Sequence, residues 1–455
     1  MGVGKSGQTL VDLCVQWVSK CIDRRVLRPG MRVPSIRDLA RQRRVSPFTV
    51  AEAYERLVAQ GHLQARRGSG FYVCARTATD RRAPTKQALP IDLSWLMDNM
   101  LADSAAQGPG LGVLPASWLK SLPLSEALRA LGRERQSQWF GSGTGRGFEP
   151  LRAVAQQRLA ALDIVAPLNR VVLTTGVTHA LSLVVRSVVH ASDAVLVLDP
   201  CWFGALGLLA AHGARVIAVP CSAHGPDLEA LERIAYREKP KLLIISSVAQ
   251  NPTGLSLTEE MGARLVALAR RCDFLIFEDD IYADLCSARS RPLAAIDQLD
   301  RVIYATGFSK TLASNIRVGY FACRDDLADR LVNAKVLSGF ATPELNERLV
   351  HRLLVEGRFI KHMRVLRERL ALCRERAKAI LLENRVRFLG DPTEGMFLWI
   401  ETDCDTTQLA ATLRAQKLLL APGSLFSPNQ SPSRWMRVNV TTPEVTLRRV
   451  IRSFR

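Results

Sequence analysis

The sequence predicts an α/β fold: a small helical module that ends in a β-hairpin, then a large module with a mostly parallel sheet and a smaller C-terminal subdomain. The chain has 455 residues, which is longer than one typical domain. Of these residues 47% are hydrophobic, which is enough for a large core. Residues 1–90 hold 17 lysine and arginine residues and 6 acidic residues, a net charge of +11 within the formal total of +19. From about residue 91, strand-sized apolar runs alternate with amphipathic segments, which predicts a sheet buried on both faces.

The first module is predicted to contain three helices and a hairpin. Apolar residues at helical spacing follow Thr9, Ser35 and Ser46, and each of these hydroxyl side chains can cap a helix N-terminus. A glycine-rich turn over residues 66–70 then separates two short apolar runs. This order is typical of a winged helix-turn-helix, whose third helix enters the major groove of DNA. The positive charge of the module fits such a polyanionic partner.

These residues resemble the GntR-type DNA-binding domain over about residues 8–75, with caps, turn and wing at matching spacings. Pro47 and Ala51 stand where arginine is common in that family, so more of the binding is expected from the wing. The resemblance implies that the residues in contact with double-stranded DNA are Ser35, Arg37, Ser46, Thr49, Arg66 and Arg67.

A linker is predicted between the two modules. Residues 76–90 are rich in arginine, threonine, alanine and proline and have no apolar period. We therefore predict a DNA-binding domain over 1–75, a linker over 76–90 and a second domain over 91–455.

The second module is predicted to alternate strands with helices. The helices expected between strands include residues 178–189, 228–236 and 258–271. The expected strands are residues 171–175, 195–199, 216–219, 242–246, 274–278, 302–305 and 318–323.

Polar residues follow these strands, and ligands in parallel sheets bind at the carboxyl ends of strands. The first strand ends in Gly176, Val177 and Thr178 at a helix start, which is typical of phosphate binding. The polar residues after the later strands are Asn251, Asp279, Tyr282, Ser309, Lys310 and Arg317.

In this order the residues resemble the fold-type I pyridoxal-phosphate enzymes, the aspartate aminotransferase superfamily, over roughly residues 91–455. The resemblance implies pyridoxal 5′-phosphate as cofactor, with Lys310 forming a Schiff base with it and Asp279 facing its ring nitrogen. Arg437 matches the arginine that binds a substrate carboxylate. The other implied cofactor contacts are Gly176, Val177, Thr178, Trp202, Asn251, Tyr282, Ser309 and Arg317.

Three departures from that superfamily weaken the case for fast transamination. Gly307 replaces a hydroxyl residue often found three positions before the lysine, and Ser314-Asn315 stands where Pro-Gly is common. The stretch 139–152 resembles the segment that supplies a tyrosine to the partner subunit's cofactor, but it contains no tyrosine.

Composition and spacing exclude several other classes of protein. No apolar run is long enough to cross a bilayer, and ten cysteines without a C-x-x-C pair favour a reducing cytoplasm. No membrane partner is expected for the same reason, the lack of a bilayer-length apolar run. The seven histidines share no metal-ligand spacing, so no metal site is expected. The stretch 2–6 has a P-loop-like Gly-Lys-Ser but lacks the earlier glycine of that motif.

Together the two modules resemble the MocR subfamily of GntR-type bacterial transcriptional regulators. The resemblance implies a cytoplasmic homodimer, located on the nucleoid when bound to DNA, that senses pyridoxal phosphate or its adduct with an amino acid or amine. Ligand chemistry at Lys310 would shift domain closure, and the short linker would pass this change to the winged helices.

Two alternatives remain from the sequence. One is a catalytically active aminotransferase with a secondary DNA-binding role. The other is a regulator that has lost the cofactor and uses the second module only to dimerise, against which the presence of Asn251, Asp279, Lys310 and Arg317 argues.

Overall fold

The structure is a computed structural model of the chain. It divides into two compact units, Met1–Ala88 and Leu89–Arg455, each with its own buried core. The linker predicted over 76–90 lies outside the described residues, so the division into residues 1–75, 76–90 and 91–455 stays a prediction. The residues that the structure describes are 9–23, 27, 30–59, 62–66, 69–73, 108–134, 141–288 and 290–454.

The first unit is the predicted winged helix-turn-helix. Its elements are α1 (Leu10–Asp23), α2 (Ile36–Arg43), α3 (Pro47–Ala59), β1 (Leu63–Arg66) and β2 (Gly70–Val73). The strands β1 and β2 pair antiparallel and form the wing. The core is small and well covered, because Val18, Leu39, Val50, Tyr54 and Leu57 are fully buried between the helices.

The second unit contains an eight-stranded sheet in the order β3-β10-β9-β8-β7-β4-β5-β6. The ladders from β5 through β4, β7 and β8 to β9 are parallel, while β10 runs antiparallel to both of its neighbours. This confirms the mostly parallel sheet and all seven predicted strands. The bounds are β3 (Val171–Thr174), β4 (Ala194–Asp199), β5 (Arg215–Ser222), β6 (Gly225–Pro226), β7 (Leu242–Ile245), β8 (Leu275–Asp279), β9 (Val302–Gly307) and β10 (Gly319–Ala322).

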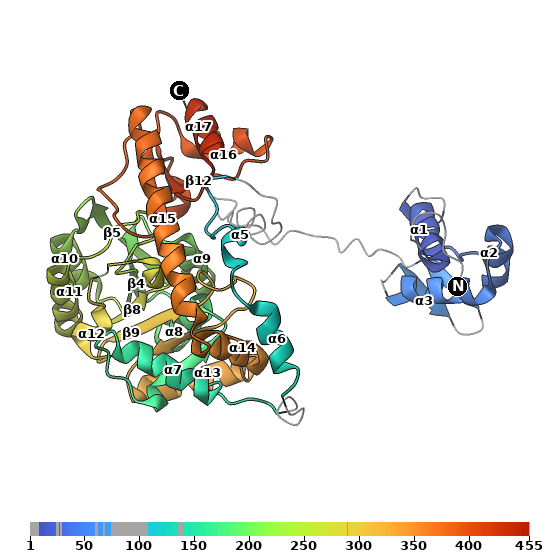
Figure 1. Cartoon of the computed structure of the whole chain (residues 1–455), viewed down its shortest axis with the longest axis horizontal. Helices are drawn as coiled ribbons and strands as arrows, with labels where there is room; N and C mark the ends of the chain where they lie inside the picture. The colour runs from blue at the N-terminus through green and yellow to red at the C-terminus, as the bar shows by residue number, and fades with distance from the viewer. Residues whose placement is uncertain are drawn as a thin grey trace. The chain divides into compact units, whose positions relative to one another are not determined.

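Helices cover this sheet, and Figure 1 shows α10, α11 and α12 side by side along one edge of the unit. The helices before β7 are α5 (Ala116–Leu119), α6 (Leu124–Leu131), α7 (Glu149–Ala160), α8 (Val177–Val188), α9 (Phe203–His212) and α10 (Leu228–Glu238). Those that follow are α11 (Glu259–Cys272), α12 (Leu293–Asp297), α13 (Asp325–Gly339), α14 (Glu344–Val355) and α15 (Arg358–Glu383). No helix in the described ranges is long and apolar enough to cross a membrane.

A smaller C-terminal subdomain follows, as predicted. Its three strands lie antiparallel in the order β11-β13-β12, and α15 contacts both α14 and the last helix, so it joins this subdomain to the rest of the unit (Figure 1). The register pairs Arg437 on the central strand with Trp399 and Ala421. The elements are β11 (Phe397–Glu401), α16 (Thr406–Arg414), β12 (Ala421–Pro422), β13 (Trp435–Asn439) and α17 (Glu444–Arg452).

Candidate cofactor and effector site

Residues from four separate segments meet at the carboxyl edge of the large sheet. Asp279 is the last residue of β8, and Lys310 comes three residues after β9 ends. Arg437, from the middle of β13, reaches the same place and donates from Nη1 to Asn251 Oδ1 at 2.8 Å. Asn251 in turn donates from Nδ2 to the hydroxyl of Tyr282 at 3.5 Å. The fold therefore joins residues that are up to 186 positions apart in the chain.

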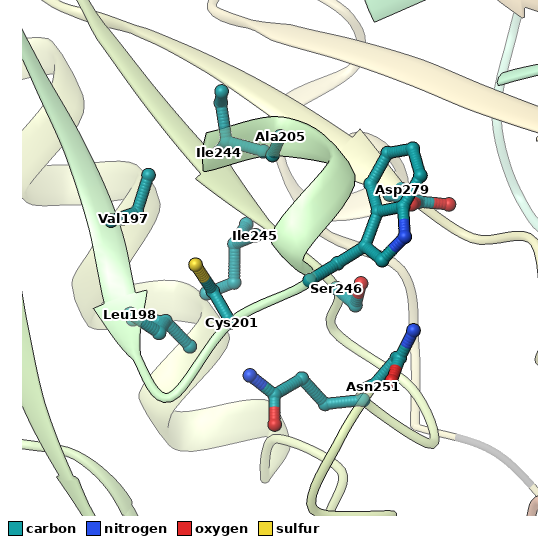
Figure 2. A pocket seen from close by; sticks show the side chains of 11 residues that line it. Val197, Leu198, Cys201, Ala205, Ile244, Ile245, Ser246, Asn251 and Asp279 are labelled. Carbon is teal, nitrogen blue, oxygen red and sulfur yellow. The ribbon is translucent and has the colours of Figure 1, made fainter. Parts of the chain in front are cut away.

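A small cavity opens beside these residues between β4 and β7. Figure 2 shows its polar residues Asn251 and Asp279 on one side and the aliphatic Val197 and Leu198 on the other. The half-buried Trp202 also lines the cavity, at the N-cap of α9. A Cβ at Gly204 would lie 2.3 Å from the indole Cζ2, so a glycine is needed to seat this ring. An aromatic ring and a buried carboxylate on one cavity suit a flat, protonated heterocycle.

Burial and neighbouring charges tune two ionisable groups of the site. Burial lowers the pKa of Lys310 to about 8; the cations Arg437 and Arg317 act in the same direction, and Asp279 opposes them. Burial raises the pKa of Asp279 to about 6, offset in part by the hydrogen bond that its Oδ1 accepts from Ile281 N at 3.1 Å. An amine with a lowered pKa is the nucleophilic form that reacts with an aldehyde.

Arg437 is almost completely buried, with 1% of its surface exposed. Its guanidinium carbon lies 4.4 Å from the ring centre of Phe397 and 5.2 Å from that of Phe426. Burial lowers the pKa of Arg437 to about 10. Its Nε has no hydrogen-bond partner among the described residues. A buried cation with an unused N–H fits an incoming anion such as a carboxylate.

The N-terminus of α8 lies beside Arg317, whose positive charge acts on Lys310. Gly176 caps this helix with φ +102°, and a Cβ there would lie 3.2 Å from Arg317 Nη2. Glycine at this position thus lets the guanidinium approach the helix start. Val177 is buried and Thr178 is exposed in the first turn. Free helix amides next to a cation fit a phosphate group.

Ser309 is half-buried between β9 and Lys310, and its backbone carbonyl accepts from Ser314 Oγ at 3.2 Å. No side-chain contact of Ser309 is recorded within the described ranges, so its predicted role toward a phosphate stays a prediction.

A segment that we name the 108–113 strap crosses the site, and it was not predicted from the sequence. Lys310 Nζ donates to the carbonyl oxygen of Gly112 at 2.7 Å, and Arg437 Nη2 donates to that of Gly110 at 2.5 Å. Asn439 Nδ2 donates to the carbonyls of Leu111 and Val113 at 2.9 and 3.0 Å.

The signal for the strap was present as three glycines in the five residues 108–112. Glycine is required because a Cβ at Gly108 or Gly110 would lie 2.4–2.5 Å from the backbone of Leu419 and Leu420. Glycine-rich runs are common in turns, so only the fold identifies this one as part of the site.

All six residues that are predicted to contact DNA belong to the first unit. Ser35 and Ser46 act as helix caps, accepting from Asp38 N at 3.2 Å and from Thr49 N at 3.1 Å. Arg37 is exposed on α2, and Thr49 is half-buried in the first turn of α3. Arg66 ends β1 but its side chain is not described, and Arg67 lies outside the described residues. Contact of these six residues with DNA stays a prediction.

Two family patterns cover most of the chain. The family of aminotransferases class I and II matches residues 113–454, and the gntR family of bacterial regulatory proteins matches residues 15–73. The aminotransferase class I and II fold implies pyridoxal 5′-phosphate as cofactor. The described residues contain no group of three or more histidine, cysteine or acidic side chains that could hold a metal ion.

Individual relatives match both units or the second unit alone. An uncharacterized HTH-type transcriptional regulator of Escherichia coli, YdcR, is 30% identical over 91% of this chain and 91% of its own. A 2-aminoadipate transaminase of Thermus thermophilus is 32% identical over 74% of this chain and 87% of its own. The crystal structure of LysN, an α-aminoadipate aminotransferase from Thermus thermophilus complexed with N-(5′-phosphopyridoxyl)-L-leucine, superposes with a TM-score of 0.72 at 26% identity, covering 79% of this chain and 94% of LysN.

Proposed function

Because the chain belongs to the MocR-type regulators, in which a GntR winged helix is fused to an aminotransferase class I and II domain, we propose that its second unit senses pyridoxal phosphate or an adduct of it with an amino acid or amine. Binding of this ligand changes the affinity of the first unit for specific double-stranded DNA. The protein acts in the cytoplasm and is located on the nucleoid when it is bound to DNA. The observation that carries this proposal is the pair of hydrogen bonds from Lys310 and Arg437 to the 108–113 strap. The strap is continuous in the chain with the segment that leads back to the DNA-binding unit.

The residues of the site would hold the cofactor by complementary chemistry. The cofactor supplies an aldehyde and an electron-withdrawing ring. Lys310 would present the amine, Asp279 would hold a proton at the ring nitrogen, and Trp202 would cover the ring face. Burial raises the pKa of Tyr282, which therefore stays protonated and donates with Asn251 toward the ring oxygen. The amides of residues 176–178, with Ser309 and Arg317, bind the phosphate.

Effector binding would act on the strap through competition. An effector carboxylate can form an ion pair with Arg437 through two parallel hydrogen bonds, whereas the neutral carbonyl of Gly110 accepts a single bond from Arg437 Nη2. Such a carboxylate therefore displaces Gly110 from the guanidinium. With the cofactor held at Lys310, the hydrogen bond from Lys310 Nζ to the carbonyl of Gly112 would be lost as well. Both events would remove hydrogen bonds to the strap at Gly110 and Gly112, while Asn439 keeps its bonds to Leu111 and Val113, and the resulting shift of the strap is what the linker would transmit.

Selection of bound genomic fragments by the full-length protein tests this function. We expect a discrete repeated or palindromic site whose affinity changes when pyridoxal phosphate and an amino acid are added. Arg437→Met should remove the response to the amino acid and keep the site itself. The matched control is Arg434→Met, an exposed arginine just before β13. Binding that is independent of sequence, with or without cofactor, would contradict the proposal.

A second candidate is aminotransferase activity. It is favoured by the 32% identity to a 2-aminoadipate transaminase and by the presence of Lys310, Asp279 and Arg437 in one site. Steady turnover of an amino donor with a 2-oxo acid would support this candidate. Conversion that stops after one equivalent per site would support sensing alone.

The capture of pyridoxal phosphate by the cofactor-free protein should depend on pH through Lys310. The reacting amine must be neutral, so the rate should rise with pH and level off above an inflection near 8, the lowered pKa of Lys310. Arg437→Met removes a cation that disfavours the ammonium form, so the pKa of Lys310 rises and the inflection moves to higher pH. Arg437→Lys keeps the charge and should keep the inflection. Stopped-flow absorbance measures the rate, and an inflection above 10 in the unaltered protein would overturn the assignment.

We also propose a homodimer formed through an apolar patch around the end of α13. Leu337 is 88% exposed and Phe340 is 78% exposed. The stretch that resembles the partner-facing segment of the superfamily packs beside this patch, because a Cβ at Gly143 would lie 3.2 Å from Ala341 Cβ and one at Gly145 would lie 3.0 Å from Val336 Cγ2.

Leu337→Glu should weaken the dimer at least about 30-fold, since it places a charge in the centre of the buried patch of both subunits. Sedimentation velocity across a concentration series measures the change. Val445→Glu, on the 81% exposed Val445 of α17, should leave the dimer intact. Equal dissociation constants for the two variants would place the interface elsewhere.

A further inference from the structure

The recognition helix α3 presents an aromatic side chain to solvent at its N-terminal end. Phe48, the second residue of α3, is 78% exposed, while Val50, Ala53, Tyr54 and Leu57 of the same helix are completely buried. The buried residues assign the inner face of the helix, so Phe48 points away from the core of the unit. In a helix-turn-helix, the N-terminal residues of the recognition helix contact base edges.

The start of α3 holds Phe48 in a defined place. Ser46 Oγ accepts from Thr49 N at 3.1 Å and lies 2.8 Å from Thr49 Oγ1, so cap and first turn are tied together. Phe48 lies between these two residues in the chain. The backbone that carries Phe48 is therefore held in place before a partner binds, so its aromatic side chain offers a preformed apolar surface.

The rest of α3 offers little to read a guanine edge. Its sequence from Pro47 to Ala59 contains one arginine and no lysine. That residue, Arg56, is paired with Glu52 at 2.7 Å and with Asp12 at 3.0 Å. The exposed side chains of the first turn, Pro47 and Phe48, present only carbon atoms.

The surroundings of Phe48 fit nucleic acid better than another apolar surface. The preceding helix and its cap carry the exposed arginines Arg37, Arg41 and Arg44, whose charge suits phosphates. In the major groove, the one apolar group that a base pair presents is the 5-methyl group of thymine. Phe48 could therefore contact a thymine methyl group while the neighbouring arginines contact the backbone phosphates on either side of it.

We propose that Phe48 is a specificity-determining residue that contacts thymine 5-methyl groups in the major groove, so that each half-site carries an A·T pair opposite the start of α3. This assignment rests on the proposed DNA-binding function and names the chemical group of the DNA that the first unit recognises.

The test replaces single thymines of the selected site by uracil, which removes only the 5-methyl group and keeps every hydrogen-bonding group of the base. Binding of the full-length protein is measured by fluorescence anisotropy for each position in turn. We expect uracil at one or two positions of a half-site to weaken binding about fourfold per methyl group. This is the change in affinity expected when the burial of one methyl-sized group is lost. Uracil at the other positions should have no effect.

Variants at Phe48 separate this contact from a general loss of affinity. Phe48→Ala should bind the thymine site more weakly and bind the thymine and uracil sites equally, with an unchanged salt dependence because no phosphate contact is lost. Phe48→Leu should retain part of the preference for thymine. Val445→Ala, a matched exposed apolar residue of the second unit, should change neither value.

The possible results distinguish failure of the role proposed for Phe48 from failure of the proposed DNA-binding function. Specific binding with equal affinity for thymine and uracil at every position would overturn the role of Phe48 and leave DNA recognition standing. A Phe48→Ala variant that changes the oligomeric state and retains its preference for thymine would show that Phe48 contacts protein instead. Absence of any sequence-specific binding would overturn both.

Discussion

Replacing Lys310 with alanine is expected to abolish the visible absorption band of the bound cofactor, because lysine is the only side chain that supplies the amine for its aldehyde. The loss should be complete, whereas folding should change little. The variant removes one hydrogen bond, from Lys310 Nζ to the carbonyl of Gly112, and such a bond contributes about 1 kcal/mol to the free energy of unfolding. Visible absorbance and urea unfolding measure the two quantities. A band retained in the variant would disprove the assignment.

A second buried lysine provides the control for this prediction. Lys335 of α13 is 2% exposed, and burial lowers its pKa to about 8, as for Lys310. Its Nζ donates to the carbonyl of Leu173 at 2.8 Å and to Thr342 Oγ1 at 3.3 Å, and neither of these partners is a predicted cofactor contact. After borohydride reduction, peptide mapping should find the phosphopyridoxyl group on Lys310 and not on Lys335. Label on both would mean that a lowered pKa alone, rather than the site, selects the lysine.

Binding to DNA is expected to fall by on the order of 10³-fold between 50 and 200 mM salt, since neutralised phosphates release counterions and a dimer contacts several phosphates. The positive charge concentrated in residues 1–90 is the source of this dependence. The double variant Arg66→Ala/Arg67→Ala should lower affinity for all sequences. It should also reduce the slope of log K against log salt by about 2 per subunit. Anisotropy titrations at five salt concentrations measure the slope.

The matched control removes the same charge from the second unit. Arg233 and Arg237 are exposed on α10, so Arg233→Ala/Arg237→Ala lowers the net charge equally without altering the wing. Its slope should match that of the unaltered protein. A wing variant with an unchanged slope would show that the wing does not touch phosphates.

Much of the fold could be predicted from local patterns. The strands β4 and β7 are short, continuous apolar runs, as expected for strands buried on both faces, and Ser35 and Ser46 mark helix starts by their hydroxyl groups. The antiparallel placement of β10 between β3 and β9 could not be predicted. Its sequence is as apolar as that of a parallel strand, and direction depends on pairing with residues far away in the chain.

The site could be predicted residue by residue but not as an assembly. Lys310, Asp279 and Asn251 stand out because polar residues that follow buried strands collect at one edge of a sheet. The hydrogen bond between Asn251 and Arg437 depends on docking of the C-terminal subdomain, which no local pattern specifies. Phe397 and Phe426, which flank Arg437, are ordinary core residues in the sequence and become part of the site only through packing.

By itself the sequence determined the two-module organisation, the winged helix, the mostly parallel sheet and the kinds of residue available to a cofactor. These features depend on periodicity, capping and charge, which act over a few residues at a time. Only the tertiary structure decided that the 108–113 strap accepts hydrogen bonds from both Lys310 and Arg437. It also decided that Lys310 has a lowered pKa and that Phe48 faces solvent. The physical reason is that burial and long-range hydrogen bonds arise between segments that are remote in the chain, and their strength depends on the surroundings that the whole fold creates.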